Sequence, residues 1–235
     1  MGHRSLIAGR NSGIIQLMTF SRVRRLPTTA VLLLVLSGLS FAASAKVEPI
    51  GAPPATGFSD AIRQAVADKG NRVTLEDGWT AEFWFARQIP AQDNAAPAAL
   101  YPKLAASAFV GIVRLPQGTS DYRGQSIPAG AYTLRYEPLP QDGNHMGVAP
   151  NPDFLLLSPA ADDSRPEQLY VARKLVALSS KTTGTGHPAV IALDLAGEAA
   201  TVVKQEDGMI VFTAELPGAG AKQKLGIVIK GTAAQ

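Results

Sequence analysis

Stretches in which apolar and polar side chains alternate recur from Arg72 to Lys230, and this period of two restricts the fold more than any other feature of the sequence. In Trp79–Phe85, every second residue, beginning with Trp79, falls on one face of an extended chain, and that face is apolar. Tyr132–Tyr136 repeats the pattern, with two tyrosines and a leucine on one face. We expect each such segment to be a β-strand with one face toward the core.

The predicted strands are short, and turn-forming residues separate them. Strands and helices do not alternate regularly, which disfavours a doubly wound α/β fold. We therefore predict a mainly β protein, an antiparallel β-sandwich of jelly-roll or immunoglobulin-like type with two short accessory helices. The strongest hairpin signal is Glu206–Gly208, between two apolar runs. The other predicted strands are Ala108–Leu115, Asp153–Leu157, Ala189–Leu195, Ala200–Gln205, Met209–Leu216 and Leu225–Lys230.

Two segments carry helix signals. Ser59 is suited to cap a short helix that places Ile62 and Val66 on one face and ends at Gly70. Ser164–Glu167 has the Ser-x-x-Glu pattern of a capping box, which predicts a second helix starting there. Apolar residues continue from the capping box at helical spacing, at Leu169, Ala172, Leu175 and Val176.

The beginning of the chain has the three parts of a secretory signal peptide. A group of arginines, Arg22 to Arg25, precedes an apolar run from Ala30 to Leu39, and the small residues Ala43–Ala45 follow it. The apolar run is too short for a membrane-spanning helix, which needs about 18 apolar residues or more. We expect cleavage before Lys46.

The leader also sets the predicted domain boundaries. Residues 1–45 are assigned to the signal peptide, the aperiodic residues 46–57 to a linker, and residues 58–235 to a single β-sandwich domain. Because the stretch before the arginines is unusually long for a signal peptide, translation is expected to start at Met1 or at Met18. The predicted location is the periplasm or the outside of the cell, with no membrane attachment after cleavage.

The net charge of +3 does not indicate nucleic-acid binding. Five arginines and no acidic residue lie in the first 45 positions, so 17 of the 22 lysines and arginines remain against 19 acidic residues, a net charge of −2. This remainder lacks the long basic run that is the usual electrostatic footprint of a nucleic-acid-binding protein. The chain has no cysteine, so neither a disulfide nor a lipid-anchored cysteine holds the exported protein.

One part of the sequence resembles uncharacterised exported bacterial proteins that share a domain of unknown function. The common element is a strand entered through a Pro-Ala-Gly turn, here Pro128–Gly130 followed by Ala131 and Tyr132. The resemblance implies an exported β-sandwich and adds no catalytic role, since the family has no known reaction. Its segments are Asp121–Gly124, Ile127–Leu134, Asp142–Gly147 and Asp153–Leu157.

Four residues form a candidate metal site. Asp142, His145 and Asp153 bracket one polar loop, and imidazole with carboxylate oxygens is a donor set for divalent cations. His187 ends another loop, and if strand order brings the two loops together, two histidines and one carboxylate would share a rim. The spacing matches no known metal motif, so solvated turns are the alternative. We predict no cofactor; the alternative is that the protein binds a divalent metal.

Three residues form a candidate ligand-binding face. Trp84 and Glu82 lie on the face of Trp79–Phe85 that is otherwise polar, and Arg135 lies on the polar face of Tyr132–Tyr136. An exposed aromatic ring beside hydrogen-bonding groups is suited to stack a sugar ring or a partner's apolar side chain. The alternative is that one of the predicted helices covers Trp84.

These observations predict an exported, non-catalytic module that binds a ligand or a partner, with a glycan or an envelope protein as the expected partner. One alternative is a metal-dependent enzyme that uses His145 and His187 with Asp142 or Asp153. The other is a structural protein of the cell envelope. No nucleophile motif is present, because a Gly-x-Ser-x-Gly elbow and cysteine are both absent from the sequence.

Overall fold

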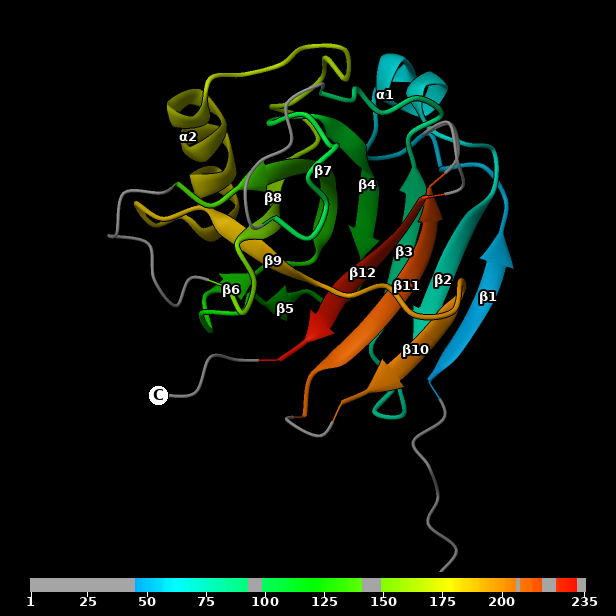
Figure 1. The fold of residues 1–235 in the computed structure, drawn as a ribbon. Helices are drawn as coiled ribbons and strands as arrows, with labels where there is room; N and C mark the ends of the chain where they lie inside the picture. Colours follow the sequence, from blue (N-terminus) through cyan, green and yellow to red (C-terminus); the bar gives the residue numbers. More distant parts are fainter. Residues whose placement is uncertain (1–44, 93–98, 141–148, 206–207, 217–222, 232–235) are drawn as a thin grey trace, which may run out of the picture. The chain divides into compact units, whose positions relative to one another are not determined.

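A computed structural model describes residues 45–92, 99–140, 149–205, 208–216 and 223–231. This part of the chain is mainly antiparallel β, with two helices and one large sheet that is nearly closed (Figure 1). The prediction of a mainly β protein with two helices is therefore confirmed. Within the described residues, neither helix is long and apolar enough to cross a membrane.

In the described residues, ten strands form the large sheet in the order β1-β2-β3-β4-β7-β8-β9-β12-β11-β10. A separate hairpin of β5 and β6 interrupts the chain between β4 and β7, and the connection from β9 to β10 passes over two strand positions. The strands are β1 (Lys46–Ile50), β2 (Gly70–Thr74), β3 (Thr80–Phe85), β4 (Phe109–Leu115), β5 (Thr119–Ser120), β6 (Ser126–Ile127), β7 (Gly130–Pro138), β8 (Asp153–Pro159), β9 (Ala189–Asp194), β10 (Thr201–Lys204), β11 (Ile210–Leu216) and β12 (Gln223–Lys230).

The sheet begins earlier in the chain than the sequence suggested. Residues 46–57 were predicted to be a linker, but Lys46–Ile50 form β1 and pair with β2 from Lys46 opposite Thr74 to Ile50 opposite Gly70. The predicted hairpin around Glu206–Gly208 is confirmed by the pairing of β10 with β11. Gly208 has a φ of +88°, a left-handed conformation that glycine adopts without steric cost.

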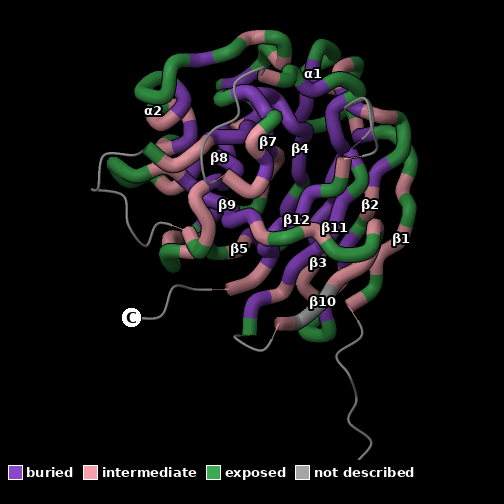
Figure 2. The backbone as a smooth tube through the Cα atoms, in the orientation of Figure 1, coloured by how far each residue is buried: buried purple, intermediate pink, exposed green. Residues whose placement is uncertain are grey.

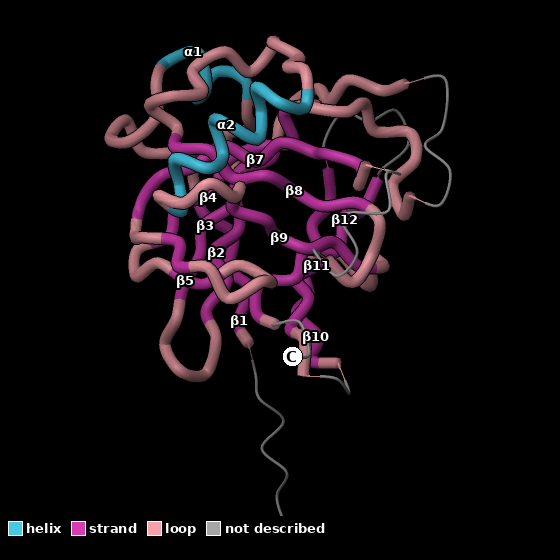
Figure 3. The backbone as a smooth tube through the Cα atoms, turned by 90° about the vertical axis from the view of Figure 1, so that its left-hand side faces the viewer, coloured by secondary structure: helices cyan, strands magenta, loops and turns pink. Residues whose placement is uncertain are grey.

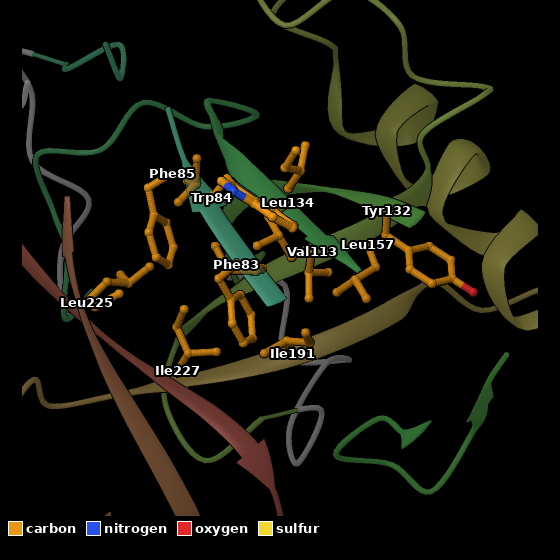
Figure 4. Packing of buried hydrophobic residues seen from close by; sticks show 14 of the residues in the cluster. Phe83, Trp84, Phe85, Val113, Tyr132, Leu134, Leu157, Ile191, Leu225 and Ile227 are labelled. Carbon is orange, nitrogen blue, oxygen red and sulfur yellow. The ribbon is translucent and has the colours of Figure 1, made fainter. Parts of the chain in front are cut away.

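The core lies between strands that are not neighbours in the sheet. The ring centroids of Phe83 on β3 and Phe212 on β11 are 5.3 Å apart. Figure 4 shows Phe83 and Phe85 pointing toward Leu225 and Ile227 of β12, and all four side chains are buried. The apolar faces of the two halves of the sheet therefore pack against each other, which is what the period-two pattern requires of side chains on one face.

The predicted polar faces of β3 and β7 are buried as well. Residues Ala81–Phe85 on β3 and Tyr132–Glu137 on β7 are all buried. Figure 2 shows that buried backbone, in purple, predominates in the interior of the sheet. These strands are covered on both faces, so the alternation of the sequence separates an apolar core face from a second, mixed face that other segments cover. The side chains of that mixed face are described below.

Helix α1 (Asp60–Ala65) begins as the sequence predicted. Ser59 is its N-cap, and its hydroxyl accepts a hydrogen bond from the backbone N–H of Ile62 at 3.4 Å. The helix ends at Ala65, earlier than the predicted end at Gly70, because Val66 already pairs with Ala86 after β3 in an extended conformation. This bridge attaches α1 directly to the sheet.

Helix α2 (Ala172–Thr183) begins eight residues after Ser164, the first residue of the predicted capping box. Ser164 and Glu167 lie in a non-helical segment, so the prediction of a helix start at Ser164–Glu167 is wrong. The helix packs on β8, where the Ser179 hydroxyl donates to the carbonyl oxygen of Leu157 at 2.6 Å. Figures 1 and 3 show α1 and α2 at the same end of the sheet.

The two edge strands of the sheet, β1 and β10, lie side by side over part of their length (Figure 1). No ladder hydrogen bonds join them in the described residues. An ion pair between Lys230 of β12 and Asp77 in the turn after β2 spans this region. The sheet is thus nearly closed, with an unpaired seam at which side chains supply the contact.

Candidate functional site

Trp84 is buried rather than exposed. Only 2% of its surface is accessible, and its indole Nε1 donates a 2.7 Å hydrogen bond to the carbonyl oxygen of Gly51. The ring of Phe58 packs edge-on against it, with the ring centroids 6.3 Å apart. The segment between β1 and α1 therefore covers this face of β3. The expectation of an open ring was wrong, and Trp84 does not offer a surface on which a sugar stacks.

Glu82 belongs to a row of alternating charges across four strands. The register places Glu48, Arg72, Glu82 and Arg114 opposite one another on β1, β2, β3 and β4. The Oε1 atom of Glu82 accepts from Nη2 of Arg72 at 2.7 Å, and Oε2 accepts from Nε of Arg114 at 2.6 Å.

The row determines the charge state of Glu82. Burial by itself raises the pKa of Glu82, but the hydrogen bonds from Arg114 and Arg72 outweigh burial and hold the pKa below its ordinary value. Both carboxylate oxygens are thus used in joining β2, β3 and β4. Glu82 is a structural residue in this geometry, contrary to its predicted place on a ligand face.

Arg135 is also buried, at 0% exposure, and forms an ion pair with the equally buried Asp163. Its Nε and Nη2 atoms donate to the two carboxylate oxygens of Asp163 at 2.6 and 2.9 Å. The remaining hydrogen bonds of the guanidinium go to backbone carbonyl oxygens, those of Ser107 at 2.9 Å, Gln168 at 2.7 Å and Arg165 at 2.8 Å. Arg135 is therefore fully occupied and does not face solvent as the sequence suggested.

These contacts fix a segment that we call the strap, residues 163–170, across β7. The aromatic ring of Tyr170 lies 4.6 Å from the guanidinium carbon of Arg135, and that of Phe109 lies 5.7 Å away. The backbone N–H of Tyr170 also donates to the Ser107 hydroxyl at 2.9 Å. In Figure 1, the chain around the strap crosses the top of the view between α2 and α1. A buried, bidentate ion pair thus holds a non-helical segment in one place.

The predicted metal ligands do not come together where they are described. Asp142 and His145 lie outside the described residues. Asp153 is fully buried at the start of β8, whereas His187 is exposed after α2. Because Leu157 pairs with Ala189 in an antiparallel register, His187 is level with Pro159, at the opposite end of β8 from Asp153.

Six residues of strand separate these two levels, which at about 3.3 Å per residue is roughly 20 Å. Asp153 and His187 therefore do not share a metal ion, and the predicted site that joins both is wrong. Among the described residues, no group of three or more histidines, cysteines or acids is placed to hold a metal. A site at Asp142 and His145 stays a prediction.

Two buried carboxyl groups lie near the end of β7, but on opposite faces of the sheet. Asp153 is opposite Pro138, so it shares a face with Tyr136, whose hydroxyl donates to Asp153 Oδ2 at 3.1 Å. Glu137 points to the other face, where its Oε2 accepts from the backbone N–H of Ser107 at 3.1 Å. Burial raises the pKa of Glu137 to about 7, although the hydrogen bond from Ser107 lowers it. The two groups are not a carboxyl pair for acid–base chemistry.

A hollow lies between α1, the chain after β3, and the strap. Its volume is about 610 Å³, within the roughly 300–1,000 Å³ typical of small-molecule sites. Apolar side chains and polar side chains share its lining. The apolar ones are Ala65, Ile89, Pro90, Phe109 and Pro166, and the polar ones are Gln64, Arg87, Gln88 and Glu167.

A smaller hollow of about 330 Å³ adjoins it. Gln64 and Arg87 line both hollows. The smaller hollow also contains two ion pairs, in which Arg63 contacts Asp60 and Arg87 contacts Asp68. A third hollow, at the seam beside Leu75, measures only about 210 Å³. The joined pair at α1 is the candidate ligand site because it combines a volume typical of small-molecule sites with convergent polar groups.

Backbone hydrogen bonds hold the residues between the two hollows. The N–H of Arg87 donates to the carbonyl oxygen of Ala65 at 2.9 Å, and the N–H of Ala67 donates to that of Phe85 at 2.9 Å. Nε of Arg87 also donates to the carbonyl oxygen of Gln64 at 3.3 Å. Helix α1 and the end of β3 are therefore joined as one unit, and Arg87 is oriented before any ligand arrives.

Comparison with known proteins gives no independent assignment: no protein-family model, curated protein or solved structure matches the chain.

No sequence pattern identified the residues of the joined hollows as a site. Arg87 and Gln88 directly follow the alternating segment that ends at Phe85, and no motif distinguishes them from an ordinary strand end. Glu167 was assigned to a helix cap. Only the position of Gln64 on the exposed face of the predicted first helix marked it as accessible.

Proposed function

We propose that this protein is an exported, non-catalytic binding module whose ligand occupies the joined hollows beside α1. The observation that carries the proposal is the larger hollow, which has the size of a small-molecule site and a mixed lining of apolar and hydrogen-bonding groups. One wall is the strap, which the buried pair of Arg135 and Asp163 keeps in place. The opposite wall is α1, which is joined to the sheet.

This arrangement supports binding through preorganisation. A site whose walls are already ordered loses little conformational entropy when a ligand enters. The hollow lies at the end of the sheet where α1, α2 and the strap gather, and loops on a rigid scaffold are common places for binding residues. Binding elsewhere on the faces of Trp84, Glu82 and Arg135 has no support, because all three side chains are buried.

The export, the sandwich arrangement and the resemblance to uncharacterised exported proteins are part of the proposal. Export rests on the leader before Lys46 and on β1, which starts at that residue and so gives the processed chain an ordered beginning. The sandwich rests on the packing of Phe83 against Phe212 across the core. The resemblance rests on the Pro128–Gly130 turn that leads into β7.

A fluorescent label in the larger hollow tests the proposal. The chain has no cysteine, so Gln88→Cys introduces a single labelling point in the lining, and Arg173→Cys on the exposed side of α2 is the matched control. We expect members of a library of small soluble compounds to change the emission of an environment-sensitive dye at residue 88 and not at residue 173. If no compound distinguishes the two positions, the binding role is refuted and a structural role in the envelope replaces it.

Export has its own test. The full-length chain is expressed in a Gram-negative host, and the product is purified from the periplasmic fraction and from the medium. We expect its first residue to be Lys46. An intact amino terminus in the cytoplasmic fraction would contradict export.

A further inference from the structure

The joined hollows differ from an ionic site in the way their charges are arranged. Both arginines in the lining already contact a carboxylate, Arg63 that of Asp60 and Arg87 that of Asp68. Glu167 adds one further carboxylate on the strap side. A ligand anion placed here would meet an acid beside each arginine, and a ligand cation would meet the arginines. The lining therefore does not select strongly for either sign of charge.

The same side chains are well suited to a ligand that donates and accepts hydrogen bonds at many points. The amides of Gln64 and Gln88 each offer a carbonyl oxygen and an NH₂ group, and each arginine–aspartate pair offers N–H donors beside carboxylate acceptors. A sugar hydroxyl is both donor and acceptor, so it finds a partner at every one of these positions. Ion pairing also holds the arginine side chains in place.

The apolar part of the lining completes the match. Ile89, Pro90 and Pro166 place carbon surface in the larger hollow, and Phe109 at the start of β4 also lines it. The C–H face of a sugar ring buries well on such a surface, while its hydroxyls reach the polar rim. A long acyl chain would give the amides of Gln64 and Gln88 no hydrogen-bond partner, and buried polar groups without partners cost free energy.

From this geometry we propose that the joined hollows bind a neutral oligosaccharide, with Gln64 and Arg87 contacting the unit that passes from the larger hollow to the smaller. This inference rests on the proposed binding role and names its ligand class. Gln64 and Arg87 are the specificity-determining residues because both hollows share them.

Isothermal titration of the processed protein with three neutral probes tests the inference: maltotriose, cellotriose and the trimer of N-acetylglucosamine. Octanoate and trialanine serve as an apolar anion and as a peptide. We expect at least one sugar to bind with an affinity that is unchanged between 50 and 500 mM NaCl. A neutral sugar forms no ion pair with the protein, so salt has no such interaction to screen.

Two variants locate the binding. Arg87→Lys keeps the positive charge and removes the planar set of N–H donors, and Gln64→Ala removes the amide from an exposed position on α1. Each is expected to weaken sugar binding at least tenfold. Arg173→Lys, an equivalent change on the outer side of α2, is expected to leave the affinity unchanged. Far-UV circular dichroism and the thermal midpoint check that each variant is folded.

The outcomes separate the two levels of the proposal. Equal sugar affinity in the wild type, Arg87→Lys and Gln64→Ala overturns the assignment of these residues. Binding of octanoate or trialanine at the labelled Gln88→Cys site, with none of the three sugars bound, overturns the ligand class and leaves the binding role intact. A dye at residue 88 that responds to no sugar and to no member of the small-molecule library overturns both.

Discussion

The buried pair of Arg135 and Asp163 gives the most demanding prediction about stability. In Asp163→Ala, the guanidinium of Arg135 stays at 0% exposure without its anion, and the hydroxyls of Thr133 and Tyr170 lose the carboxylate that accepts from them at 2.7 and 3.1 Å. Leaving one member of a buried ion pair unpartnered costs about 3–5 kcal/mol. The lost hydroxyl partners place this variant at the upper end, near 5 kcal/mol.

Urea unfolding followed by tryptophan fluorescence measures the effect. With a slope near 2.5 kcal/mol per molar urea for a domain of this size, the midpoint of Asp163→Ala is expected to fall by roughly 2 M. Because the stability of most domains is only about 5–15 kcal/mol, the variant is expected to remain folded only marginally. Asp163→Asn keeps the shape of the side chain, with a carbonyl oxygen that accepts hydrogen bonds and an NH₂ group that donates them. It is expected to lose less free energy of unfolding than Asp163→Ala.

The double variant Arg135→Met with Asp163→Leu is the control. It removes both charges and replaces them with apolar side chains of similar size, so it is expected to recover at least half of the loss in Asp163→Ala. A midpoint shift below about 0.5 M for Asp163→Ala would contradict the reasoning. So would a double variant that is less stable than Asp163→Ala, because both results would mean that the pair is not desolvated as the structure shows it.

Two further predictions concern single residues. The pKa of Glu137 rises from its ordinary 4.5 to about 7 on folding, so the folded protein binds this proton more tightly than the unfolded chain does. The contribution of the group to stability is therefore complete below about pH 4.5 and is lost as the pH rises through 7. Glu137→Gln is therefore expected to match the wild type in urea unfolding at pH 4.5 and to be more stable by about 3 kcal/mol at pH 8. An equal difference in the free energy of unfolding between variant and wild type at both pH values would contradict the burial of an ionisable Glu137. In Gly226→Ala, the new Cβ would lie 2.5 Å from the carbonyl oxygen of Asp194, where β12 meets β9. A loss of about 1–3 kcal/mol is expected in the same assay, and an unchanged midpoint would mean that β12 and β9 are not held in this close approach.

Much of the architecture followed from the sequence because it depends on local pattern. The period of two located β3 and β7, the Asp-Gly turn located the β10–β11 hairpin, and Ser59 located the start of α1. In each case a nearby group supplies the physical cause: a side chain alternates with its neighbours, or a hydroxyl caps an N–H three residues away.

The start of α2 shows where local reasoning fails. The Ser-x-x-Glu pattern at Ser164–Glu167 favours a capping box. In the structure, however, Arg135 donates hydrogen bonds to the carbonyl oxygens of Arg165 and Gln168 and forms an ion pair with the carboxylate of Asp163. Carbonyl oxygens at the start of a helix accept hydrogen bonds from N–H groups further along it. The long-range contacts of a buried guanidinium are stronger than those of a solvated capping box, so the segment forms a turn at Pro166 and Glu167 and no helix.

Sequence alone therefore determined that this protein is mainly β and which residues of each strand are apolar, because these properties depend on spacing along the chain. Tertiary structure decided which polar residues are buried and which are accessible. Trp84, Glu82 and Arg135 alternate with the core residues just as exposed side chains would, yet distant segments or neighbouring arginines cover them. The joined hollows arise only where α1, the end of β3 and the strap meet, and no spacing along the chain records that meeting.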